Sequence, residues 1–352
     1  MKKTRGKQKI AIGIILGLAL AVFLIAVVPN QLGAHYESLS VSDQMILKEF
    51  DTYCQSADTE DIWPGFALDE KTILAIDDSF GSAYLINPSG EIRNIFAKKI
   101  QMPADLNLTV YRISPLAPQL LSFRIDGNFN TIGKTYSCFG NEVYYVKYDQ
   151  EKSVFSPYSS SHFTTLLSHE AFHYYMQDQW AAGSTYSAED LSGEDLALLY
   201  EEYQVLTKIQ EALLDNISDQ NLWMEYAREY AAIVRQRIQK NPSYVKKELE
   251  RETVEGTAVY VGIKASRIAG YDYGVMYFDN IKDVPFSDLQ RTVETGSYEK
   301  QNLADRIPYE TGALLCLLMD ELKIPDWQEQ LNRQTSSDPV TLYDIIQKHC
   351  ET

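Results

Sequence analysis

The chain has 352 residues, of which 45% are hydrophobic and 12% aromatic. This composition is sufficient for a packed core and excludes wholesale disorder. The formal net charge is -17, from 32 basic and 49 acidic side chains, and the body of the sequence contains no basic stretch. A protein that binds nucleic acid needs a basic face, so we exclude nucleic acid as a partner.

The N-terminus combines a basic segment, residues 1–9, with an unbroken apolar run, residues 10–28. A run of this length is typical of a helix that spans a bilayer, and its flanking cations stay on the cytoplasmic side. We therefore predict a cell-membrane protein with a cytoplasmic tail (1–9), a transmembrane signal-anchor (10–28) and an extracytoplasmic C-terminal domain. The alternative is a cleaved signal peptide, which would leave the chain secreted.

The four cysteines are Cys54, Cys138, Cys316 and Cys350, and no two of them form a C-x-x-C pair. This spacing excludes a zinc ribbon and a thioredoxin-like redox motif. In an exported protein, four cysteines allow three disulfide pairings, which the sequence leaves open. Cys316 lies within an apolar run, so we expect it to be a buried thiol.

The first half of the exported part has the pattern of strands. We expect residues 29–60 to form a stalk or entry segment and residues 61–150 to form a β-rich part. In the latter, residues 84–87 and 91–96 predict a hairpin with its turn at 88–90. The further predicted strands are 108–113, 123–125 and 142–148.

After Pro157 the apolar residues recur at intervals of three and four, which is typical of helices. We therefore predict a helical part over residues 151–352, so that the whole chain belongs to the α+β class. The predicted helices are 162–175, 186–214, 219–240, 242–265 and 308–322.

The first of these helices carries the sequence His169-Glu170-Ala171-Phe172-His173, an H-E-x-x-H pattern. Residues four apart lie on the same face of a helix, one turn from each other. Two imidazoles in this arrangement can bind one Zn²⁺, and the glutamate between them can act on a metal-bound water. The pattern therefore predicts a zinc site in which His169 and His173 are ligands.

A catalytic zinc usually has three protein ligands and one open position, so a third ligand must come from another segment. Glu255 is the candidate, because it is flanked by Val254 and followed by small residues that would let another helix approach closely. A carboxylate in such an apolar setting requires a cation. The nearby Glu248 and Glu250 are instead expected to lie on a solvated face.

These segments resemble the gluzincin metallopeptidases of the peptidase MA type, and more distantly their aminopeptidase branch. In that branch the third zinc ligand is the glutamate of an N-E-G-x-A-x-Y segment, and Glu255-Gly256-Thr257-Ala258-Val259-Tyr260 is similar to it. The segment that starts at Pro308-Tyr309-Glu310 resembles the branch's P-Y-E-K-G-x-A-L-L motif. The resemblance implies a zincin-like catalytic part in which Tyr309 points at the carbonyl oxygen of the bond to be cleaved.

The sequence also departs from that branch. Glu255 follows His173 by 82 residues, which is far more than in the aminopeptidases, and two or more additional helices lie between them. Val254 replaces the asparagine and Thr311 replaces the lysine of the two motifs. We find no G-x-M-x-N segment, which holds the free amino terminus of the substrate in those enzymes. Aminopeptidase specificity therefore does not transfer, and endopeptidase and exopeptidase activity both remain open.

The function predicted from these features is hydrolysis of peptide bonds in peptide or protein substrates by a zinc metallopeptidase. Glu170 would accept the proton of the metal-activated water and deliver it to the leaving amine, and Tyr309 would stabilise the oxyanion. Glu252 and Arg251 share a helix face with Glu255 and are candidates for orienting a ligand from behind. A surface ion pair is the alternative for both.

Two other functions compete with this prediction. The chain could be a catalytically silent ectodomain that keeps the scaffold as a binding or sensor module, although such a module would not need Glu170 or Tyr309. It could also hold a structural zinc, but structural sites usually close with four protein ligands, often cysteines. No cysteine lies near the H-E-x-x-H pattern in the sequence.

Overall fold

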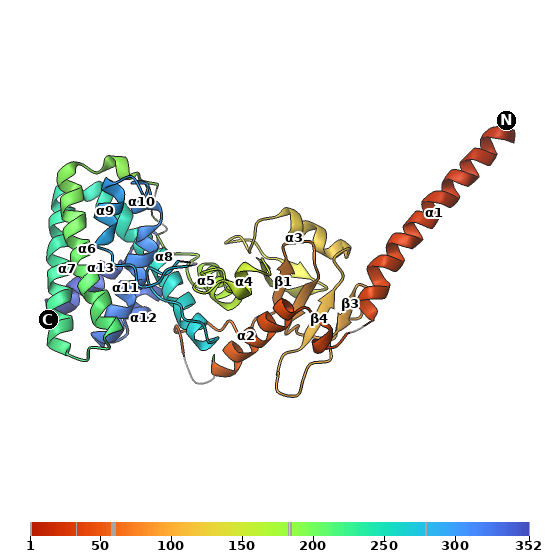
Figure 1. Ribbon diagram of the computed structural model, residues 1–352, viewed down its shortest axis with the longest axis horizontal. Coiled ribbons are helices and arrows are strands. Elements are labelled where there is room, and N and C mark those ends of the chain that lie inside the picture. The colour runs from red at the N-terminus through yellow and green to blue at the C-terminus, as the bar shows by residue number, and fades with distance from the viewer. Residues whose placement is uncertain are drawn as a thin grey trace. The chain divides into compact units, whose positions relative to one another are not determined.

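The computed structural model describes residues 2–32, 34–57, 61–181, 183, 185–278 and 280–351, apart from some side chains in the first helix (Figure 1). The chain forms two compact units. The first unit comprises residues 1–51 and 69–155, and the second comprises residues 52–68 and 156–352. The architecture is α+β, because the sheet lies in the first unit and the long helices that carry His169, His173 and Glu255 lie in the second.

The first unit is built on a five-stranded sheet with the order β3-β4-β2-β1-β7. Neighbouring strands are antiparallel except for the parallel pair of β1 and β7. Two short strands, β5 (Ser137–Cys138) and β6 (Asn141–Glu142), form a separate ribbon. The strands of the main sheet are β1 (Ile73–Asp77), β2 (Ala83–Ile86), β3 (Ala97–Lys99), β4 (Val110–Ile113) and β7 (Tyr144–Tyr148).

A buried carboxylate attaches helix α2 (Val41–Ala57) to this sheet. Asp43 accepts hydrogen bonds from the Tyr84 and Tyr148 hydroxyls, each at 2.7 Å. All three side chains are buried, so each polar group has a partner where water is excluded. The remaining helical segments of this unit are η1 (Tyr36–Ser38), η2 (Pro118–Leu120), α3 (Leu121–Ile125) and α4 (Lys152–Phe155).

Helix α1 (Lys2–Gln31) contains the predicted transmembrane segment 10–28. A helix that spans a bilayer needs about 20 consecutive residues that are predominantly apolar. Within the described part of the chain, no helix has the length and the apolar character to cross a membrane, which overturns the prediction of a transmembrane anchor. The side chains of residues 10, 11, 18, 19, 22 and 26 in the predicted segment lie outside the described part.

Two predicted strands are also wrong. Residues 91–96 form no strand, and β2 pairs with β1 and β4, so the hairpin with its turn at 88–90 does not exist. Residues 123–125 belong to helix α3. Strand β1 was not expected, yet it is buried along its whole length between β2 and β7. Strands β2, β4 and β7 lie within or close to the ranges that the alternation predicted.

The second unit is helical. The five predicted helices are all present, with ends that differ by a few residues: α5 (Phe163–Met176), α6 (Gly193–Leu214), α7 (Gln220–Lys240), α8 (Pro242–Ile268) and α11 (Ile307–Glu321). Pro242 is the first residue of α8, and the Asn241 side chain caps that helix. The segments that the periodicity did not predict are η3 (Ala188–Asp190), α9 (Asp288–Glu294), α10 (Asn302–Asp305), α12 (Trp327–Asn332) and α13 (Leu342–Cys350).

Helix α8 packs directly against both α5 and α11. Glycines allow the close approach of the backbones: a Cβ atom added to Gly262 would lie 3.4 Å from the carbonyl oxygen of Thr165 on α5. On the other side, Gly256 of α8 faces Gly312 of α11 with no room for a Cβ atom between them. These two crossings bring the three motif-bearing helices together.

Trp63 attaches the segment 52–68 to the helices of the second unit. Its fully buried indole donates a hydrogen bond to Asn332 Oδ1 at 2.8 Å and meets the ring of Phe172 edge-on, with centroids 4.8 Å apart. Phe172 lies between Glu170 and His173 on the buried side of α5. The aromatic contact therefore holds α5 against the segment that carries Trp63. Cys316 is a fully buried thiol, as the sequence predicts.

Candidate metal centre

His169, His173 and Glu255 converge at the crossing of α5 and α8. Their ligand atoms all lie within 4.8 Å of one another, and they form the one such group among the described histidine, cysteine and acidic residues. His173 Nε2 lies 3.2 Å from His169 Nε2 and 3.3 Å from a carboxylate oxygen of Glu255. The helix spacing of the two histidines and the packing of α8 on α5 together create this geometry.

These distances suit a tetrahedral zinc ion. With metal–ligand distances of about 2.0–2.1 Å, two ligands of a tetrahedron are separated by about 3.3 Å. Two imidazole nitrogens and one carboxylate oxygen are also the donor set of catalytic zinc sites that keep one open position. The His173 and Glu255 side chains are 17% and 20% exposed, so the group is accessible from solvent.

Each histidine is fixed through the side of its ring that faces away from the group. His169 makes a hydrogen bond with the backbone of Ala258 on α8. His173 Nδ1 lies 2.5 Å from the Oε1 atom of Gln177. Such partners orient metal-bound imidazoles and leave the other ring nitrogen to the metal.

The protonation of His169 also suits a ligand. Burial and then the charge of His173 lower the pKa of His169 to about 3, against the opposing effects of Glu255 and the Ala258 backbone. A neutral imidazole has a free lone pair, which metal binding requires. His169 is therefore ready to coordinate at neutral pH.

His173 and Glu255 form an ion pair in the metal-free protein. Burial acts to lower the pKa of His173, but the hydrogen bond and charge of Glu255, the charge of Glu170 and the hydrogen bond to Gln177 together outweigh it, and the pKa is raised. Burial acts to raise the pKa of Glu255, yet hydrogen bonding with His173 and the charges of both histidines lower it. The carboxylate is thus ionised, and a metal ion would replace the His173 proton as its counter-charge.

Glu170 lies beside this group on the same helix. Burial raises the pKa of Glu170 to about 7; the Glu255 carboxylate adds to this effect, while His173 acts against it. A carboxyl whose pKa lies near neutrality can both accept and return a proton. The environment of Glu170 therefore suits a general base.

Tyr309 reaches the same group from α11. Its ring is parallel to that of His169, at a 5° interplanar angle and 6.3 Å between centroids. Its hydroxyl interacts with Glu255 and with Arg251. Burial and then the Glu255 charge raise the pKa of Tyr309 to about 12, so the hydroxyl keeps its proton and can donate a hydrogen bond. The predicted oxyanion donor is therefore next to the predicted ligands.

Arg251 supports Tyr309 and has no surface ion pair among its described contacts. Its guanidinium lies over the Tyr309 ring, 5.7 Å from the centroid, and its Nη2 donates to the carbonyl oxygen of Asp305 at 3.3 Å. Arg251 thus lies against Tyr309. Its place one turn before Glu255 on α8 produces this contact.

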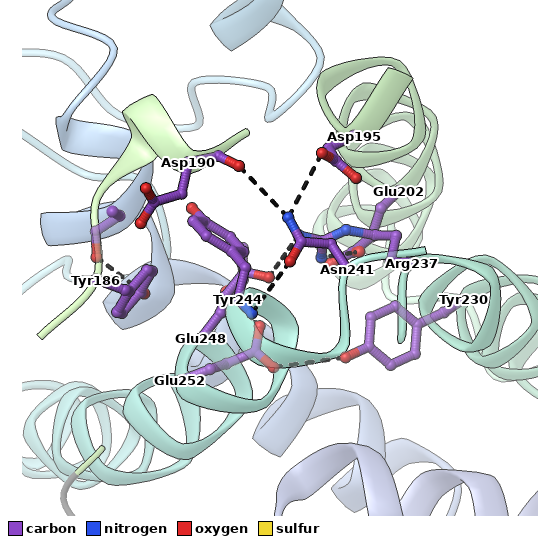
Figure 2. Close-up of polar contacts among 12 residues, drawn as sticks. Tyr186, Asp190, Asp195, Glu202, Tyr230, Arg237, Asn241, Tyr244, Glu248 and Glu252 are labelled. Carbon is purple, nitrogen blue, oxygen red and sulfur yellow. Dashed lines mark hydrogen bonds and ion pairs between the residues drawn. The ribbon is translucent and has the colours of Figure 1, made fainter. Parts of the chain in front are cut away.

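Glu252 faces another cluster, which Figure 2 shows. The Glu252 carboxylate accepts hydrogen bonds from Thr311 Oγ1 at 2.5 Å and from the Tyr230 hydroxyl at 3.5 Å. It is 3% exposed, so the expected surface ion pair is not formed. The structure therefore brings Glu252 to the interface of α7, α8 and α11 and not to the group around Glu255.

Arg237 is the cation of that buried cluster. Its guanidinium donates to Glu202 at 2.6 Å and to Glu248 at 2.5 Å, and all three side chains are buried (Figure 2). Glu248, expected on a solvated face, is thus part of the core. One guanidinium neutralises two carboxylates only in part. Burial, and to a smaller extent the negative charge of Glu202, raise the pKa of Glu252 well above its ordinary value. Burial also raises the pKa of Glu248, to about 7.

For two residues of this region, the structure differs from the sequence prediction or adds a contact that the sequence analysis did not predict. His162 precedes His169 by seven residues and so would share its helix face, which indicates a place at the rim of a cleft or on the surface; instead it is fully buried and stacks on Tyr271 with centroids 3.7 Å apart. Gln177 was missed, although it follows His173 by four residues and so shares its helix face. That spacing is the signal that could have revealed it.

No protein-family model matches the chain, and neither a curated protein nor a solved structure matches it. The assignment of the site therefore depends on the geometry of the residues described above.

Proposed function

We propose that the chain is a zinc-dependent peptidase of the gluzincin type, with His169, His173 and Glu255 as the metal ligands. The observation that carries this proposal is the convergence of these three ligand atoms within 4.8 Å, from an H-E-x-x-H helix and a second helix. The partial exposure of His173 and Glu255 supports a catalytic site over a structural one, since structural zinc is enclosed by four protein ligands.

A zinc ion bound by these residues would lower the pKa of a water molecule and polarise the carbonyl of the scissile bond. Glu170 accepts the proton of the attacking water. As the peptide bond breaks, Glu170 returns this proton to the leaving nitrogen. A pKa of about 7 allows Glu170 to perform both transfers near neutral pH.

Tyr309 acts on the carbonyl oxygen of the scissile bond. Its hydroxyl donates a hydrogen bond to the carbonyl oxygen as negative charge develops there. Stacking of its ring on His169 and the contact with Arg251 hold the hydroxyl at this position. Because these contacts exist before substrate binds, the donor needs little reorganisation during the reaction.

The test combines metal analysis with a substrate screen. We expect the purified full-length chain to bind one zinc ion and to cleave members of a mixed peptide library, with products identified by mass spectrometry. Glu170→Gln should keep the zinc and lose about 10²–10⁴-fold in the cleavage rate. The matched control is Glu211→Gln, an exposed position on α6, which should cleave at the rate of the wild type.

The same experiment separates the competing functions. If the chain binds no zinc, the metal proposal fails. If it binds zinc but Glu170→Gln cleaves at the wild-type rate, the assigned mechanism is wrong. Stoichiometric zinc with no cleavage in either protein would favour the silent binding module.

A further inference from the structure

We propose that Gln177 is a positioning residue that determines which ring nitrogen of His173 binds the metal, and that it also anchors the helix turn carrying Glu255. This inference rests on the proposed metal site. It adds to that site a residue that neither the H-E-x-x-H pattern nor the Glu255 segment contains.

The Gln177 amide is almost fully buried and uses all of its polar groups. The residue follows the last residue of α5 and is 5% exposed. Its Nε2 atom donates to the carbonyl oxygen of Val254 at 2.9 Å and to Thr257 Oγ1 at 2.8 Å. Its Oε1 atom faces His173 Nδ1 at 2.5 Å.

These contacts leave one orientation for the amide. The Val254 carbonyl oxygen can only accept a hydrogen bond, so the amide nitrogen must face it. Oε1 can only accept, so His173 Nδ1 must carry the hydrogen that it receives. The lone pair of a neutral His173 is then on Nε2, the atom that lies 3.3 Å from Glu255 and 3.2 Å from His169.

Thr257 reinforces this orientation. Its hydroxyl donates to the carbonyl oxygen of Thr253 at 2.7 Å, so its oxygen is available to accept from Gln177. Val254 precedes Glu255 by one residue and Thr257 follows it by two. One amide therefore holds the His173 ring on α5 and, at the same time, the turn of α8 that carries the third ligand.

The neutral amide differs from the carboxylate that often stands behind a metal-bound histidine. A carboxylate would raise the basicity of the imidazole and add negative charge beside Glu255. Gln177 orients the ring without that added charge. The role we assign to it is therefore geometric, and its removal should weaken metal binding without removing a ligand.

The test measures zinc affinity of the full-length chain by competition with a chromophoric chelator. Gln177→Met keeps a similar length but has no acceptor for His173, and we expect it to bind zinc about 10–100-fold more weakly than the wild type. Gln177→Glu keeps the acceptor for His173 but loses the donors to Val254 and Thr257, so it should bind zinc more tightly than Gln177→Met and more weakly than the wild type. The control is Gln179→Met, at an exposed position, which should not change the affinity.

A second measurement reports which ring nitrogen of His173 binds the zinc ion. If the role of Gln177 were merely structural, its substitution would not change that nitrogen. In ¹⁵N-histidine NMR spectra of the zinc-loaded protein, His173 should coordinate through Nε2 in the wild type and in Gln177→Glu. Gln177→Met should show mixed or altered coordination. If Gln177→Met binds zinc as tightly as the wild type and through Nε2 alone, the inference is overturned while the proposed function stands.

Failure of the proposed function and failure of the inference about Gln177 give different results. If the wild type binds no zinc, the proposed function fails and the inference is overturned with it. If the wild type binds zinc and Gln177→Met binds it equally tightly through Nε2, the inference alone is overturned.

Discussion

Gly256 of α8 and Gly312 of α11 face each other with their backbones in contact. A Cβ atom added to Gly256 would lie 2.8 Å from the amide nitrogen of Ala313, and one added to Gly312 would lie 2.8 Å from the Cα atom of Gly256. Gly256 directly follows Glu255, and Gly312 lies one turn after Tyr309. This crossing therefore sets the distance between the third proposed ligand and the proposed oxyanion donor.

We expect Gly312→Ala to separate the two helices. The neighbouring atoms are backbone atoms, which cannot move aside as a flexible side chain can. Overpacking of this kind costs about 1–3 kcal/mol or more of the free energy of unfolding. It should also weaken zinc binding, because α8 carries Glu255. Urea unfolding and chelator competition measure the two effects.

The control for this substitution is Gly193→Ala. Gly193 is the first residue of α6, and a Cβ atom added there meets nothing within 4 Å. Alanine should leave zinc binding unchanged and should not lower the stability, since it reduces the freedom of the unfolded chain. Equal stabilities for Gly312→Ala and Gly193→Ala would show that the backbones are not in contact.

We expect Tyr309→Phe to impair cleavage and preserve zinc binding. Phenylalanine keeps the ring that stacks on His169 but removes the hydroxyl that interacts with Glu255 and Arg251. Loss of one oxyanion donor lowers kcat by about 10²–10³-fold. Steady-state kinetics on a peptide found in the substrate screen, with zinc content measured in parallel, test this prediction. An unchanged kcat would exclude Tyr309 from the oxyanion site.

The sequence predicted that His169, His173 and Glu255 lie together because the signals of their helices are local. Helix periodicity gives the face shared by His169 and His173, and small residues mark the part of α8 that another backbone approaches. Glu252 shows the limit of this reasoning. It lies one turn before Glu255, but a helix face is broad, and the position of α7 and α11 decides that Glu252 turns to Tyr230 and Thr311.

The sheet was less predictable for a related reason. Residues 123–125 have the composition of a strand, yet strand pairing depends on partners distant in the sequence, and here Phe123 packs as part of a short helix. Strand β1 pairs with β7, which follows it by some 70 residues. No local pattern specifies such a partner. The burial of the charged residues on α6 and α7 could not be predicted for the same reason, because each charged residue alone is typical of a solvated helix face.

We expect Arg237→Met to destabilise the second unit strongly. The substitution leaves Glu202 and Glu248 buried without their cation. Breaking a buried ion pair by removing one partner costs about 3–5 kcal/mol of the free energy of unfolding. Urea unfolding of the full chain, followed by tryptophan fluorescence, measures the effect, since the buried Trp223 lies on the same helix as Arg237.

The control is Lys208→Met, which breaks the pair of Lys208 with Glu229 on the surface. Both side chains of that pair are about half exposed, so solvent screens the interaction and the loss should be at most about 1 kcal/mol. Similar losses for the two variants would mean that the Arg237 cluster is solvated in solution.

The raised pKa of Glu252 predicts how the free energy of unfolding depends on pH. Burial and then the charge of Glu202 raise its pKa above the ordinary value of 4.5, so the folded protein holds this proton more tightly than the unfolded chain does. The resulting stabilisation is fully present below the unfolded pKa and is lost as the pH rises through the folded pKa. Glu252→Gln keeps the shape of the side chain and has no proton to lose.

The free energy of unfolding of the wild type should therefore fall relative to that of Glu252→Gln as the pH rises above the unfolded pKa of 4.5, by up to about 1.4 kcal/mol for each pH unit. Groups distant from Glu252 titrate alike in both proteins, so the difference between the two urea-unfolding series reports Glu252 together with its coupling to Glu202 and Glu248. If the difference stays constant with pH, Glu252 is ionised in the folded protein, and the negative charge of the cluster must be balanced in another way. If the difference changes as expected, the Arg237 cluster carries its excess carboxyl as a neutral acid, which fits a dry interface of α7, α8 and α11.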